Sequence, residues 1–204
     1  MKTVKNLGVY FDRYMNFESH IDEIYKKVMG TLIYLNRIKE SFEPSTRKIV
    51  VQSLALSFIN YCLKVWGAAS DTQLHRVQKL VNFAARVAVG NVRKYDHISP
   101  HLKKLEWPKI KDQYALEICI LVFKALNNII PECLYKFPTI SSVINVTTRH
   151  SDELYTARYK TDIGSRQIRI RGPLLYNKLP GRIKETGSIS TFKLNLKKMF
   201  LTES

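Results

Sequence analysis

Apolar residues recur at helical spacing through the first two thirds of this 204-residue chain. After Ser19 they fall every three or four positions, with charged residues between them, which predicts an amphipathic helix that buries one stripe. The stripe consists of Ile21, Ile24, Val28, Leu32, Leu35 and Ile38. Ser19 followed three positions later by Asp22 resembles a capping box, so we expect the helix to begin there.

Three further helices are predicted in the next part of the chain. Pro44 suits the first turn of a helix that continues to Gly67 and is apolar on nearly every side, so we expect it to be central. Asp71 is a plausible N-cap for a helix that ends at Gly90 and presents alanines for close packing. Pro108 opens a fourth helix, whose amphipathic start passes into an apolar middle.

The pattern changes at both ends of the chain. A strand-like run from Leu7 to Phe11 needs a partner, because its backbone groups cannot stay buried alone. It either pairs with a distant strand or belongs to a sheet encoded upstream. The run RQIRIRG, starting at Arg166, favours a short edge strand, and Ser190 is a plausible cap for a last helix.

These elements predict a mainly α fold: a helical bundle with a short N-terminal strand and a small α+β C-terminal portion. Residues 137–162, where Ser, Thr and isolated hydrophobics replace the helical pattern, are expected to be a loop or linker. The expected organisation is therefore a strand region at 1–18, a helical domain at 19–136, the linker at 137–162 and a basic region at 163–204.

The charge of the chain narrows the choice of partner. Lys and Arg number 33 against 17 Asp and Glu, for a net charge of +16. Residues 41–106 and 150–204 hold most of this excess. Such a surface repels itself and favours a polyanionic partner, so RNA or DNA is the leading expectation, ahead of a basic surface without a specific partner and of a membrane surface.

The cysteines and the apolar runs of the sequence indicate in which compartment the protein is expected. The three cysteines, Cys62, Cys119 and Cys133, are widely spaced in apolar neighbourhoods and are interpreted as reduced core residues of an intracellular protein, in the cytoplasm or the nucleus. The longest apolar run, ICILVF, is far shorter than the roughly 20 residues that cross a bilayer. No membrane association is expected.

Four stretches carry a family resemblance when taken in order. They are KNLGVYFDRYMNFESHI from Lys5, INYCLKVWG from Ile59, DHISPHLKKLEW from Asp96 and GPLLYNKLPGRIKETGSISTFKLNLKKMFL from Gly172. Together they resemble the C-terminal third of reverse transcriptases of non-LTR retrotransposons, of the jockey and chicken-repeat kind, over almost the whole chain. The resemblance implies the end of a palm, a thumb and a C-terminal region that contact template and primer, with Leu7, Gly8 and Val9 near a primer grip.

The chain departs from that family where its chemistry would lie. Polymerases of this kind hold two Mg²⁺ ions with paired aspartates, and no Asp-Asp pair occurs in this sequence. We therefore assign no catalytic residue, metal ligand or cofactor to this chain and expect it to be inactive alone as an RNA-directed DNA polymerase. The alternative is a host-retained helical module that binds nucleic acid or protein without a polymerase role.

Two groups of basic residues are candidates for contacting nucleic acid. Arg76, Lys79 and Arg86 fall within a sector of roughly 80° on a helix, which suits a phosphate backbone or an ordinary solvated face. The second group alternates with Tyr155, Tyr159 and Ile168, which would permit base stacking beside phosphate contacts or serve only to anchor a loop. Its members are Arg158, Lys160, Arg166, Arg169 and Arg171.

Overall fold

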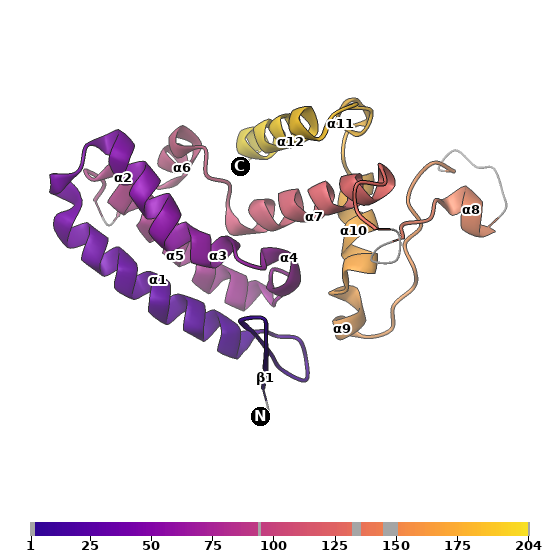
Figure 1. Cartoon of the computed structure of the whole chain (residues 1–204), viewed down its shortest axis with the longest axis horizontal. Helices are drawn as coiled ribbons and strands as arrows, with labels where there is room; N and C mark the ends of the chain where they lie inside the picture. Colours follow the sequence, from indigo (N-terminus) through magenta and orange to yellow (C-terminus); the bar gives the residue numbers. More distant parts are fainter. Residues whose placement is uncertain (1–2, 94, 132–135, 145–150, 204) are drawn as a thin grey trace. The chain divides into compact units, whose positions relative to one another are not determined.

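The structure is a computed structural model that describes residues 3–93, 95–131, 136–144 and 151–203. It divides into two compact units, residues 1–113 with the last two residues of the chain, and residues 114–202. The described part is mainly helical with one short antiparallel hairpin, which confirms the predicted fold class (Figure 1). No described helix is long and apolar enough to cross a bilayer.

The first unit begins with a hairpin in place of the expected lone strand. β1 (Val4–Asn6) pairs antiparallel with β2 (Val9–Phe11), and Asn6 lies opposite Val9. Leu7 and Gly8 form the two-residue turn, with φ values of 44° and 81°. Positive φ at both turn positions matches the twist of a tight hairpin, and glycine adopts it without strain. The predicted strand over Leu7–Phe11 is therefore wrong in its bounds, and its partner is local.

Helix α1 (Glu18–Ile38) starts without the predicted capping box. The Asp12 carboxylate instead accepts hydrogen bonds from the backbone N–H groups of Asn16 and Phe17, at 3.0 and 2.6 Å. Phe17, in the left-handed region at φ 57°, turns the chain into the helix. Asp22 bonds another helix, so the Ser19–Asp22 interpretation is wrong. The predicted apolar stripe is buried from Ile21 to Leu35.

The predicted helix from Pro44 to Gly67 is broken in the structure. It comprises α2 (Pro44–Val51), a π-helical segment η2 (Gln52–Leu56), α3 (Ser57–Asn60) and α4 (Leu63–Trp66). Between α3 and α4, Tyr61 is extended and Cys62 has a φ of 51°, and these two non-helical residues interrupt the helix. Trp66 is fully buried and its indole N–H donates to the Tyr61 carbonyl at 2.9 Å, which holds this break closed.

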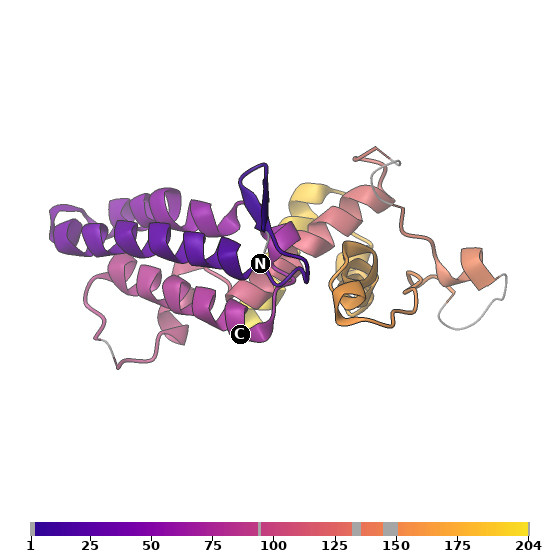
Figure 2. The same cartoon turned by 90° about the horizontal axis from the view of Figure 1, so that it is seen from below.

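Helix α5 (Asp71–Val89) confirms the third predicted helix, with Ser70 rather than Asp71 as its N-cap and Gly90 as its C-cap. Its alanine-rich face is buried at Ala84, Ala85 and Ala88. Figures 1 and 2 show α1, α2 and α5 lying side by side, and these helices form the core of the first unit. A 3-10 turn η1 (Lys39–Ser41) follows α1, and α6 (Ser99–Leu105) packs on α5.

The second unit is built on the apolar part of α7 (Ile110–Leu126). Phe123 stacks on Phe192 of α12 (Ile189–Glu203), with ring centroids 4.2 Å apart. Ser188, not Ser190, caps α12, because its hydroxyl accepts from the Thr191 N–H at 3.2 Å. The remaining helices are α8 (Ile140–Ile144), α9 (Asp162–Ser165), α10 (Ile168–Asn177) and α11 (Gly181–Lys184).

The edge strand predicted from Arg166 to Gly172 is wrong. Ile168 begins α10, and Gln167, the extended residue before it, accepts the first backbone hydrogen bonds of the helix from Ile170 and Arg171. Ile170 is buried and Arg169 is exposed. A strand would separate neighbouring side chains in this way, but a turn of helix does so as well. No residue from 163 to 203 lies in a strand.

Candidate functional site

Arg76, the first basic residue predicted on α5, holds two helices together. Its guanidinium donates to Asp22 Oδ1 of α1 at 2.7 Å and to Gln73 Oε1 at 2.8 Å, and it lies over the Tyr25 ring. Both partners of the ion pair are about two-fifths exposed, so water screens the interaction and its contribution to stability is modest. Arg76 is thus already engaged within the protein.

Arg86 is also engaged, whereas Lys79 is not. The Arg86 guanidinium donates to the carbonyl oxygens of Asp96, at 3.1 Å, and of Arg93, at 3.4 Å, which fastens the segment after α5 to the helix. Lys79 is exposed and forms no ion pair with any described residue. The predicted stripe of three cations therefore contains one side chain that is available without breaking a contact.

The basic group of the second unit divides in the same way. Arg166 pairs with Asp162, and its side chain is only 12% exposed. Arg171 is half-buried and donates from Nε to the Ser165 carbonyl at 3.1 Å. Both arginines therefore build the turn between α9 and α10.

The other three cations of this group stand on the surface around α9. Arg158 and Lys160 lie in the extended segment before α9, and Arg169 lies in the first turn of α10. All three are exposed and make no ion pair with another described residue. Tyr159, which lies between the first two, is 52% exposed. We call these four residues the α9 basic cluster.

The three residues likened to a primer grip lie at the hairpin. Leu7 is 83% exposed at the turn, Gly8 follows it, and Val9 is buried against the first unit. The Tyr61 hydroxyl, at the end of α3, donates to the Leu7 carbonyl at 2.7 Å. This bond ties the turn to the helical body across 54 residues of sequence.

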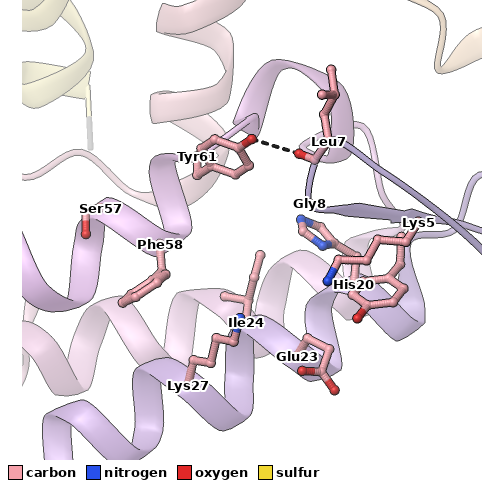
Figure 3. A pocket seen from close by; sticks show the side chains of 11 residues that line it. Lys5, Leu7, Gly8, His20, Glu23, Ile24, Lys27, Ser57, Phe58 and Tyr61 are labelled. Atoms are coloured by element: carbon pink, nitrogen blue, oxygen red, sulfur yellow. Dashed lines mark hydrogen bonds between the residues drawn. The ribbon is translucent and has the colours of Figure 1, made fainter.

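A pocket of about 470 Å³ opens beneath this turn (Figure 3). The hairpin, α1 and α3 with its C-cap contribute its walls. The lining residues are Lys5, Leu7, Gly8, Tyr10, His20, Glu23, Ile24, Lys27, Ser57, Phe58 and Tyr61. In Figure 3, Phe58 and Tyr61 face Lys5 and His20 across the hollow, with Ile24 and Lys27 along α1 between them. The size is in the range of small-molecule sites.

His20 is the buried polar residue of this pocket. It is 4% exposed, and neither ring nitrogen has a hydrogen-bond partner among the described residues. Its ring packs against Trp66, with centroids 6.0 Å apart, and against Tyr10, at 6.5 Å. Burial, together with the nearby charge of Lys27, lowers the pKa of His20 from its ordinary value, so the imidazole is neutral at pH 7.

Sequence analysis missed His20 and the pocket. His20 lies one helical turn before Ile24 of the buried stripe, so its position in the sequence predicts only that its side chain contacts the core. The pocket itself depends on a hairpin and on a helix break at Tyr61 that the periodicity did not indicate. The signal available in the sequence was the Asn-Leu-Gly-Val turn.

The described residues contain no group of three or more His, Cys, Asp or Glu side chains that could hold a metal ion. His97 and His101 are four positions apart, a spacing that would place two metal ligands on one face of a helix. Helix α6 begins at Ser99, after His97, so the two side chains do not share a helical face. Cys62 and Cys119 are free thiols, and burial raises the pKa of Cys119 to about 12. Cys133 lies outside the described residues.

Comparison with protein-family models, with curated proteins and with solved structures finds no match to this chain.

Proposed function

We propose that this chain binds single-stranded RNA or DNA through the α9 basic cluster, as a thumb-like C-terminal part of a non-LTR reverse transcriptase. The observation that carries the proposal is that three exposed cations, without an ion-pair partner among the described residues, and an exposed tyrosine lie within residues 158–169, on either side of α9. The family assignment rests on the four sequence stretches, and the binding role rests on the cluster.

The physical argument starts from what a lone surface cation can do. Arg166 and Arg171 donate hydrogen bonds to acceptors within the protein. Arg158, Lys160 and Arg169 are exposed, so their N–H groups can donate to a ligand. Phosphate oxygens accept strong charge-assisted hydrogen bonds from such groups, and each contact releases condensed counterions. Contacts of this kind carry no base information, so the binding should be largely independent of sequence.

Tyr159 adds a preference for unpaired strands. Tyr159 is half exposed on the segment that also carries Arg158 and Lys160, and a Cβ added at Gly164 of α9 would lie 3.3 Å from its Cβ. A base stacks on an exposed aromatic face only where it is free of its complementary strand, and such stacking tolerates every base. The cluster therefore favours single strands over duplexes.

The test is a salt titration of binding to a fluorescent 20-nucleotide single strand, with the variant Arg158→Gln/Lys160→Gln/Arg169→Gln. We expect the slope of log K against log salt to flatten by about 2, because each lost contact removes about 0.7. The matched control Arg182→Gln/Lys193→Gln/Lys198→Gln removes the same charge from exposed positions of the same unit.

The control separates a site from a general charge effect. If both triple variants lose affinity and slope equally, the α9 basic cluster is not a site. If the parent does not bind at moderate salt, the proposed function itself is wrong. Preservation of helical circular dichroism in each variant establishes that the chain is folded.

A further inference from the structure

The pocket beneath the hairpin has features that nucleic-acid binding by α9 does not use. It lies wholly within the first unit, whereas the α9 basic cluster lies in the second. His20 borders it with two ring nitrogens that no described residue bonds, and a buried polar group without a hydrogen bond costs free energy. A ligand that supplies that hydrogen bond would recover the cost.

The walls of the pocket are mostly apolar and aromatic. Phe58 is 44% exposed beside it, and Ile24 and Tyr10 complete the apolar lining on the side of α1 and the hairpin. The aromatic planes favour a flat ring system, which gains both buried area and ring contacts. The apolar body of the ligand should therefore be aromatic.

The rim of the pocket selects the charge of the ligand. Lys5 and Lys27 line it, and both are exposed side chains that can turn toward a bound group. Glu23 is the single acidic residue among the described residues that line the pocket. Its Oε1 lies 3.6 Å from Nζ of Lys26, a lysine outside the lining. Two lysines against one partly neutralised carboxylate attract an anion.

We propose that this pocket binds a small aromatic carboxylate, with its ring beside Phe58 and its carboxylate between Lys5, Lys27 and His20. The neutral imidazole donates one hydrogen bond to a carboxylate oxygen while the lysines supply the countercharge. The Tyr61 bond to Leu7 holds the hairpin as one wall of the pocket. This binding site is independent of the proposed nucleic-acid role.

The test uses 2-naphthoate as the probe and the full chain labelled with ¹⁵N. We expect saturable shifts of the Gly8 and Ser57 amides, which border the pocket, at millimolar or lower ligand. The uncharged 2-naphthamide should bind more weakly, because it lacks the charge that the two lysines attract. Absence of shifts at these amides, or equal binding of the amide and the acid, overturns the proposal.

Two exposed lysines of the first unit provide a matched pair of variants. Lys27→Gln should weaken 2-naphthoate binding by about two- to fivefold, as expected for an exposed charge contact, whereas Lys79→Gln should not, because Lys79 neither lines the pocket nor pairs with a described residue that does. Equal effects of both variants contradict the proposed placement of the carboxylate.

A third variant fills the pocket from its rim. Ser57 is exposed, and its hydroxyl donates to the backbone oxygen of Ser53 and to no other described residue, so Ser57→Phe should fold. This variant should abolish the shift of Gly8 on addition of 2-naphthoate. Binding that survives unchanged in Ser57→Phe would mean that the probe binds elsewhere on the chain.

Discussion

Gly90, the residue that ends α5, is the position where a single methyl group should disturb the first unit most. Its φ is 92°, and a Cβ added there would lie 1.8 Å from Nη1 of Arg47. Arg47 is buried, and its guanidinium donates to the carbonyl oxygens of Val89, at 3.3 Å, and of Phe42, at 3.0 Å. Lys39 also donates to the Gly90 carbonyl, at 3.1 Å, so the ends of three helical segments meet here.

The cost of Gly90→Ala has two parts. Gly90, at φ 92° and ψ −55°, lies outside the left-handed helical region, and a non-glycine residue in so sparsely populated a conformation is strained by about 1–3 kcal/mol. The methyl group also displaces the Arg47 guanidinium from its two carbonyl acceptors, and hydrogen bonds of a charged group contribute about 1.5–3 kcal/mol. We therefore expect Gly90→Ala to lower the free energy of unfolding of the first unit by about 3–6 kcal/mol.

A double-mutant cycle with Arg47→Met separates the two parts. Methionine keeps the apolar stem of Arg47 but leaves no guanidinium for the added methyl group to displace, so Gly90→Ala should then cost only the backbone strain. The expected coupling is about 1.5–3 kcal/mol. Urea unfolding followed by tryptophan fluorescence reports on the first unit alone, because Trp66 and Trp107 both lie in residues 1–113. A coupling below about 0.5 kcal/mol, the limit of ordinary additivity, would refute this account of Arg47.

Two other predictions concern His20 and Phe192. Burial and Lys27 lower the pKa of His20 in the folded state, so the unfolded chain binds a proton at a higher pH than the folded chain does. As the pH falls below 6.5, the first unit should therefore lose up to about 1.4 kcal/mol of stability per pH unit, and the loss should stop at the pKa of the folded state. His20→Gln should lack this part of the pH dependence of urea unfolding, and an identical profile would contradict the assignment. Phe192→Ala should destabilise the second unit by about 3–5 kcal/mol, because the ring is fully buried against Phe123. Amide exchange in α7 and α12 measures this loss, and protection that stays at the parent's level would show that the stacked pair is not its core.

The helices with a clear apolar period were predictable from the sequence. The stripe from Ile21 to Leu35 is buried as expected, and Gly90 ends α5 where its sequence position indicated. Pro108 likewise marks the start of α7 within two residues. These features depend on residues that are close in sequence, so periodicity and capping chemistry are sufficient to find them.

The errors arose where a contact overrides a local pattern. An apolar run predicts one helix from Pro44 to Gly67, but the buried Trp66 and its bond to the Tyr61 carbonyl stabilise a break within it. The arginines after Arg166 alternate with isoleucine as in a strand, yet the bonds of Arg166 and Arg171 to Asp162 and Ser165 stabilise the turn into α10. Short β1 is polar and was not recognised as a partner for β2.

The sequence by itself determined the mainly α class, the basic character of the chain and the two groups of cations that could meet a polyanion. Only the tertiary structure decided which of those cations are available, because an ion pair such as Arg76 with Asp22 joins residues that are 54 positions apart. The tertiary structure also creates the pocket at His20. Tyr61, Leu7 and His20 come together only when the hairpin is paired and α3 is packed on α1. Composition counts charges and periodicity assigns faces, whereas the partner of each side chain is set by packing between distant segments.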